Sequence, residues 1–175
     1  MKSVKFIILS FLVILFLLVA SKTFAQEKPL HEVYSAMVFN FTKYVQWPDN
    51  TESGDFVIGV VGNEEMFKTL STWYSGKAKG AKKYVIKSFK NASEVSECHI
   101  VFIDRSKSGE FESIKGRVKG KGTLIVTDRN GLCAKGSSIN FKTVDNKLKF
   151  ELNQQAIEAS NLKVSSSLVS MAILI

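Results

Sequence analysis

Short apolar runs of strand length constrain the fold of this chain more than any other feature. Residues 56–61 and 99–103 are the two plainest runs. A strand with one face in water alternates apolar and polar residues, so a continuous apolar run predicts a strand that is covered on both faces. Residues 83–89 and 122–127 are two further predicted strands.

Helical patterns precede and separate these strands. Residues 29–45 place apolar side chains at helical spacing, and Trp47-Pro48 ends this helix because proline disfavours helical backbone in the residue before it. Residues 64–73 and 111–118 are two further predicted helices. Strands that alternate with helices predict a single α/β domain, a three-layer sandwich around a largely parallel, Rossmann-like sheet.

The last third of the chain changes pattern. Apolar and polar residues alternate on both sides of Asp145-Asn146, which predicts a C-terminal β-hairpin over residues 139–152. Asn153 is predicted to cap a helix over 154–160, and one of the serines at 165–167 to cap a final segment over 168–175. That segment is apolar, so we expect it to be buried in the core or against a partner.

The first 25 residues have the layout of a secretory signal peptide. Lys2 and Lys5 precede an apolar run over residues 6–20, and Thr23 and Ala25 stand three and one positions before the predicted cut at Gln26. The run is shorter than the roughly 20 residues that span a bilayer. We therefore predict a cleaved signal peptide over residues 1–25 and one exported, soluble mature domain over 26–175.

The common catalytic and metal-binding motifs are missing from the sequence. It contains no G-x-S-x-G, P-loop, G-x-G-x-x-G, H-E-x-x-H or C-x-x-C motif, and His31 and His99 are its two histidines. His99 adjoins Cys98, but neighbours on a strand point to opposite faces and would not chelate one ion. The sequence therefore predicts no catalytic residue, no metal and no cofactor.

The positive charge comes almost entirely from lysine. The formal net charge is +8, whereas specific nucleic-acid sites favour the rigid guanidinium fork of arginine. We therefore expect no nucleic-acid partner. The densest group, Lys77, Lys79, Lys82 and Lys83, is predicted to be a solvated loop, with attraction to anionic lipid headgroups as the alternative.

Cys98 and Cys133 allow two interpretations. They form one intramolecular disulfide, which would stabilise the fold by roughly 3–4 kcal/mol, or they remain two buried free thiols. Export permits the disulfide without requiring it, so both alternatives stay open.

Polar residues follow three of the predicted strands. Asn63 follows the first strand, Asp104 and Arg105 the third, and Asp128 the fourth. Ligands of parallel sheets bind outside the carboxyl ends of the strands, so these four residues are predicted to line one ligand crevice. The alternative is that Asp and Asn there only cap turns and helices.

Several segments, taken together, resemble the YfiR-like family of periplasmic repressors. Residues 39–48 resemble its aromatic helix ending in Trp-Pro, residues 97–103 its central cysteine-histidine strand, and residues 150–153 its Phe-Glu-Ile-Asn signature. The resemblance covers nearly the whole mature chain in the right order. The matching motif residues are Trp47, Pro48, Cys98, His99, Phe150, Glu151 and Asn153, whose alternative roles are core packing, helix termination and capping.

The resemblance implies an exported α/β protein, often a homodimer. It implies repression of an inner-membrane diguanylate cyclase, which makes cyclic di-GMP, through contact with the periplasmic sensor region of that receptor. The family is also associated with redox control through four cysteines in two bridges. Cys98 and Cys133 match one member of each pair, so the resemblance does not by itself imply the same redox switch in this chain.

Two functions therefore follow from the sequence. The first is a periplasmic regulatory binding protein that needs no catalytic residue and uses an apolar surface to hold a membrane receptor in one state. The second is an envelope small-molecule sensor that uses the strand-end crevice and acts on a histidine kinase or another membrane partner. A hydrolase with Asp104 or Asp128 as general base would lack the other groups of an active site.

Overall fold

An eight-stranded sheet in the order β10-β8-β7-β6-β5-β2-β4-β3 organises the chain. The computed structural model describes residues 28–48 and 54–175, so the predicted signal peptide over residues 1–25 lies outside the described residues. Within the described ranges, no helix has both the length and the apolar character needed to cross a membrane.

The centre of the sheet consists of parallel strands. They are β2 (Phe56–Val61), β4 (Lys82–Phe89), β5 (Ile100–Ile103) and β6 (Leu124–Thr127). Ile100 on β5 lies between Ile58 on β2 and Leu124 on β6, and all three are fully buried. The four predicted strands are therefore confirmed, and burial on both faces is confirmed for β2, β5 and β6, whereas β4 is partly exposed.

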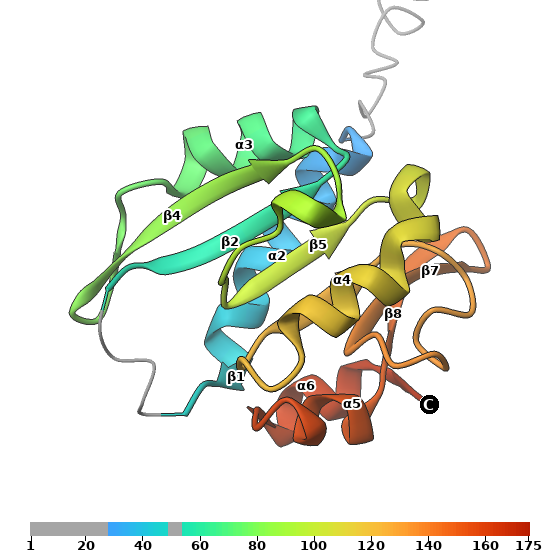
Figure 1. The fold of residues 1–175 in the computed structure, drawn as a ribbon. Coiled ribbons are helices and arrows are strands. Elements are labelled where there is room, and N and C mark those ends of the chain that lie inside the picture. Colours follow the sequence, from blue (N-terminus) through green and yellow to red (C-terminus); the bar gives the residue numbers. More distant parts are fainter. Residues whose placement is uncertain (1–27, 49–53) are drawn as a thin grey trace, which may run out of the picture.

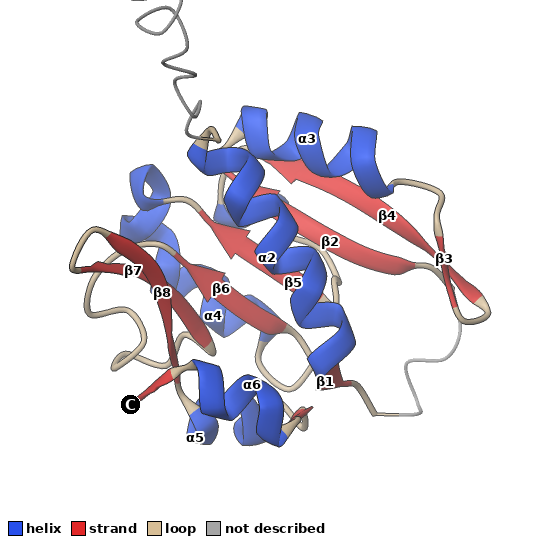
Figure 2. Cartoon of the chain, turned by 180° about the vertical axis from the view of Figure 1, so that it is seen from behind, coloured by secondary structure: helices blue, strands red, loops and turns tan. Residues whose placement is uncertain are grey.

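Helices cover both faces of this sheet. Helices α2 (Leu30–Tyr44) and α3 (Glu64–Tyr74) lie on one face, and α4 (Phe111–Val118) lies on the other (Figures 1 and 2). Two short 3-10 helices, η2 (Ala92–Glu94) and η3 (Arg105–Glu110), connect the strands near α4. The core is accordingly divided by the sheet into two clusters, which confirms the predicted three-layer sandwich.

The first helix is shorter than the pattern predicts. It ends at Tyr44, and β1 (Val45–Gln46) pairs antiparallel with β9 (Lys163–Val164). Val45 has extended backbone and is 4% exposed. A β-branched residue favours that conformation, and the pairing with β9 supplies hydrogen bonds that another helical turn would otherwise provide.

The predicted hairpin is present as β7 (Ile139–Val144) and β8 (Lys147–Leu152). Asp145 and Asn146 both have positive φ, 50° and 57°, as a two-residue type I′ turn requires. The face opposite Phe141 is also covered, because Asn140 is fully buried and Glu151 is 5% exposed. Asn140 Nδ2 donates to Glu151 Oε2 at 3.0 Å, so the two polar groups satisfy each other.

The last residues contradict the prediction in part. Helices α5 (Gln154–Ala159) and α6 (Ser166–Met171) form, capped by Asn153 and Ser165 as predicted. The chain then leaves the helix and becomes β10 (Ile173–Leu174), parallel to β8. Met171, Leu174 and Ile175 are 52–54% exposed, so these three residues are not buried in the core, and their burial against a partner stays a prediction.

The lysine-rich segment is also not a solvated loop. Ala78 and Lys79 form β3, which pairs antiparallel with the start of β4, so that Lys79 lies opposite Lys82. Both of these side chains are half-buried, whereas Lys77 and Lys83 are exposed. The segment is therefore an ordered hairpin that covers the edge of the sheet (Figure 1).

Candidate functional site

The four predicted crevice residues lie together in one cavity. Asn63 follows β2, Asp104 and Arg105 follow β5, and Asp128 follows β6, and all four line a cavity of about 580 Å³. In the sheet, β2 lies between β4 and β5. The connection from β2 to β4 passes through α3 on one face of the sheet, and the connection from β5 to β6 passes through α4 on the opposite face. The cavity is therefore at the switch point of the sheet, where α/β domains bind ligands.

Arg105 and Asp128 form the charged centre of this crevice. Arg105 Nε donates to Asp128 Oδ2 at 3.0 Å, and the Asp128 side chain is 3% exposed whereas that of Arg105 is 60% exposed. Burial raises the pKa of Asp128, and the hydrogen bond from Arg105 opposes that rise. Within the described part of the chain, the second oxygen, Asp128 Oδ1, is buried and has no hydrogen-bond partner.

Asn63 and Asp104 also have local structural roles. Asn63 Oδ1 accepts the backbone N–H of Met66 at 2.9 Å and caps α3, while Asn63 Nδ2 donates to Asp104 Oδ2 at 2.9 Å. Asp104 Oδ1 accepts the backbone N–H of Ser106 and caps η3. Asn63 and Asp104 therefore cap helices, as the capping alternative predicts.

Sequence reasoning did not include the residues that the first helix contributes to the crevice. Tyr34 is 4% exposed, stacks on Phe141 at 4.3 Å between ring centroids, and has its pKa raised by burial. His31 Nδ1 lies 3.3 Å from Glu65 Oε2 at the same cavity. The helical spacing of Tyr34 predicts that it faces the core, but the sequence does not show that the start of α2 overhangs the strand ends.

The motif residues Trp47, Pro48 and His99 line a second cavity, of about 630 Å³. This cavity lies at the opposite, amino ends of β2 and β5. Trp47 Nε1 donates to the backbone carbonyl of His99 at 3.2 Å, and His99 Nδ1 accepts the backbone N–H of Val57 at 3.1 Å. Burial is the main cause that lowers the pKa of His99 to about 4, so the imidazole is neutral at pH 7.

The remaining motif residues make contacts within the domain. Phe150 is 7% exposed and packs edge-on against Phe41. Glu151 Oε1 accepts from Lys142 Nζ at 2.7 Å. Asn153 caps α5 and donates from Nδ2 to the carbonyl of Cys133 at 2.8 Å. These contacts support the packing and capping roles of Phe150 and Asn153.

Both cysteines are buried free thiols. This finding decides between the two interpretations of the sequence. Burial raises the pKa of each thiol, Cys98 and Cys133, to about 12. Cys98 belongs to the core cluster on the α4 side, whereas His99 stacks on Phe56 on the other side, so the two neighbours point to opposite faces as predicted. The described residues hold no group of three His, Cys, Asp or Glu side chains able to bind a metal ion.

Fold and crevice together define the class: an α/β domain with a mostly parallel sheet and a polar cavity at its switch point. The chain belongs to the YfiR/HmsC-like family, whose sequence profile matches residues 31–173. This match extends from the first turn of α2 into β10. The family is a regulatory, non-catalytic domain of periplasmic cyclic di-GMP signalling. No curated protein matches the chain.

Proposed function

We propose that this chain is a periplasmic regulator that represses an inner-membrane signalling protein, a diguanylate cyclase, by binding its periplasmic sensor region. The observation that carries the proposal is the family match over residues 31–173. A contact that holds a receptor in one state requires no catalytic group, only differential affinity for the two states of the receptor. The predicted signal peptide would deliver the domain to the periplasm, where it can contact the sensor region of the receptor.

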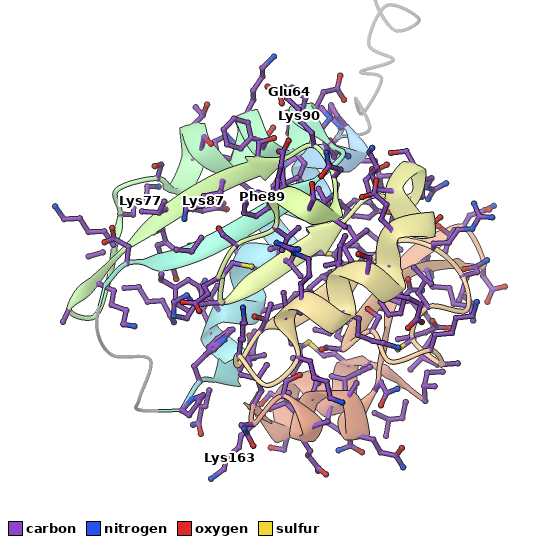
Figure 3. All side chains as sticks on the ribbon, viewed as in Figure 1. Glu64, Lys77, Lys87, Phe89, Lys90 and Lys163 are labelled. Atoms are coloured by element: carbon purple, nitrogen blue, oxygen red, sulfur yellow. The ribbon has the colours of Figure 1, made fainter. Side chains whose placement is uncertain are left out.

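The surface that we assign to this contact is the C-terminal edge surface, made of Met171, Leu174 and Ile175. These three apolar residues are each more than half exposed and lie within five residues of each other: Met171 ends α6, Leu174 belongs to the edge strand β10, and Ile175 follows it. Near the opposite edge, Lys77 and Lys87 are exposed (Figure 3). Lysines on an edge oppose strand addition, whereas an uncharged apolar edge favours a partner.

Affinity capture from membranes tests the proposal. The full chain, tagged and expressed in its own host, is captured from detergent-solubilised membranes, and the recovered proteins are identified by mass spectrometry. We expect an integral-membrane protein with a periplasmic segment and a cyclase domain. Repeated recovery of no integral-membrane signalling protein, with the tagged chain present in the periplasmic fraction, would contradict the proposal.

Substitutions distinguish specific binding through the C-terminal edge surface from nonspecific hydrophobic binding. Leu174→Glu should abolish the capture, because it places a charge in the apolar contact. Leu30→Glu is the matched control, since Leu30 is 51% exposed but lies at the other end of the domain, on α2. Light scattering of the purified mature chain tests the homodimer that belongs to the same proposal.

A small-molecule sensor is the second candidate function, and the crevice favours it. Four polar residues converge there, and Asp128 Oδ1 has no partner within the described residues. A ligand would regulate the receptor through differential affinity for two states of this domain. In a thermal-shift screen of envelope metabolites, Asp104→Ala and Asp128→Ala should each abolish the ligand-induced shift, measured against the variant's own unliganded midpoint. An unchanged shift in both variants would exclude the crevice.

A further inference from the structure

The second cavity is cationic and has an aromatic floor. Lys79, Lys82 and His99 line it together with the rings of Trp47 and Phe56, and none of the described residues lining it is acidic. Its volume of about 630 Å³ is within the roughly 300–1,000 Å³ of small-molecule sites.

Lys79 and Lys82 bring two positive charges to one place. They are direct cross-strand partners of β3 and β4, a placement in which like charges destabilise a hairpin. Within the described chain neither side chain forms an ion pair with an acidic residue. Burial is the main cause that lowers the pKa of Lys79, and the charge of Lys82 lowers it further.

The Lys79 ammonium group is held over the aromatic floor. Its Nζ donates to the carbonyl of Thr42 at 2.9 Å and lies 4.9 Å from the centroid of the Phe56 ring and 5.8 Å from that of Trp47. Trp47 and Phe56 meet edge to face at 4.9 Å between centroids. A planar apolar group that enters the cavity would therefore find the partly exposed ring of Trp47 beside a cation, while the buried ring of Phe56 supports both from below.

His99 adds a neutral hydrogen-bond donor to the same cavity. Its Nδ1 accepts the N–H of Val57, so the proton of the neutral imidazole is on Nε2. The cavity thus combines cations and a donor with apolar rings, and it holds no carboxylate of its own among the described residues.

We infer that this cavity binds a small organic anion, in which a carboxylate or phosphate lies between Lys79 and Lys82 and a planar apolar group packs on Trp47. The anion supplies the negative charge that no described residue gives to the cross-strand lysine pair. This site is separate from the strand-end crevice and does not depend on the proposed regulation of a membrane protein. A soluble metabolite and the headgroup of an anionic phospholipid share this chemistry.

Fluorescence of Trp47 provides a direct measurement. The chain has two tryptophans, so Trp73→Phe leaves Trp47 as the single reporter, inside the cavity. Phenyl phosphate, titrated into the mature chain at low ionic strength, should change the Trp47 emission saturably. Inorganic phosphate, which lacks the ring, should bind about tenfold more weakly.

Matched lysine variants assign the binding to the cavity. Lys79→Met and Lys82→Met should each weaken phenyl phosphate binding at least about tenfold. Lys83→Met, an exposed lysine on the same hairpin, should bind like the parent. Circular dichroism verifies the fold of each variant, and if Lys79→Met does not fold then Lys82→Met decides. No saturable change, or equal loss in Lys82→Met and Lys83→Met, would overturn the inference.

Vesicles distinguish the two sources of the anion. Phosphatidylglycerol vesicles that displace phenyl phosphate from the Trp47 site would identify a lipid headgroup as the ligand. Displacement by phenyl phosphate analogues alone, with no effect of the vesicles, would identify a soluble organic anion. Displacement by vesicles and displacement by soluble analogues both require that phenyl phosphate binds in this cavity.

Discussion

Arg105 and Asp128 form an ion pair in which one partner lies in water and the other in the protein. Their Nε–Oδ2 distance is 3.0 Å, and their side chains are 60% and 3% exposed. The geometry makes Arg105 the group that keeps the buried carboxylate charged. Stability and any ligand response of the crevice should therefore depend on this pair.

Removal of Arg105 should raise the pKa of Asp128 further. Burial already raises it, and Arg105→Met deletes the hydrogen bond that opposes the rise. We expect a loss of about 1–3 kcal/mol in the free energy of unfolding at pH 7, because a buried acceptor loses its donor. Carboxyl-carbon NMR titration measures the pKa, and an Asp128 pKa that does not change in Arg105→Met would contradict this assignment.

The same pair sets a pH dependence with a definite sign. A carboxyl group whose pKa is higher in the folded state binds more protons folded than unfolded, so its contribution to stability falls as pH rises through that range. The unfolding free energy of the parent, compared with Asp128→Asn, should therefore improve on acidification from pH 7 towards 3.8, the ordinary pKa of an aspartate side chain. Parallel pH profiles of the two proteins would contradict the prediction.

His99 should make the fold less stable in acid. Its folded-state pKa of about 4 lies below the ordinary value of 6.5. The unfolded chain therefore binds more protons between these values, and the stability is present above pH 6.5 and is lost as pH falls towards 4. After allowance for solvent screening of this half-buried group, we expect a loss of about 1–2 kcal/mol. Urea titrations at several pH values should show a flatter profile for His99→Gln.

Neither thiol should react in the native state. Cys98 is 6% and Cys133 1% exposed, and both pKa values are near 12, so the reactive thiolate is scarce at pH 7. A thiol reagent such as DTNB should label both cysteines in urea and neither in the folded mature chain. Mass spectrometry after mild oxidation should find both thiols intact, and a product lacking two hydrogens would indicate a disulfide instead.

Glu151 should contribute to stability through its buried partners. Its two carboxylate oxygens accept from Lys142 at 2.7 Å and from Asn140 at 3.0 Å. Glu151→Ala removes the acceptor of the half-buried Lys142 ammonium group and one of the two acceptors of the buried Asn140 amide, which keeps the Phe141 carbonyl, and we expect a cost of about 1–3 kcal/mol. Thermal unfolding measures it, with the exposed Glu158→Ala as the control. Equal effects of the two substitutions would show that the buried network is not stabilising.

Local patterns in the sequence predicted much of the architecture. The apolar runs predicted the central strands because burial on both faces leaves no periodic polar position. Asp145 and Asn146 predicted the hairpin turn because these residues tolerate positive φ. The side chain of Asn153 predicted a helix start because it can accept a free backbone N–H. Parallel strands also place their carboxyl ends at the same edge of the sheet. For this reason the sequence predicted one crevice lined by Asn63, Asp104, Arg105 and Asp128.

Long-range pairing was not predictable in the same way. The end of α2 depends on the pairing of Val45 with Val164, and the exposed end of the chain depends on the pairing of Ile173 with Glu151. The cationic cavity depends on the Lys79–Lys82 pair lying next to Trp47 and His99. Residues this far apart in the sequence leave no periodic signal that links them.

The sequence alone therefore determined the hairpin and the caps, which follow from side-chain chemistry within one segment, and the class of fold and the family, which follow from the order of such segments. Only the tertiary structure decided that the thiols are free and buried, that Tyr34 lines the crevice, and that two lysines share an aromatic cavity whose described lining contains no acid. The physical reason is that burial and charge compensation depend on which segments pack together, and packing is a property of the whole chain.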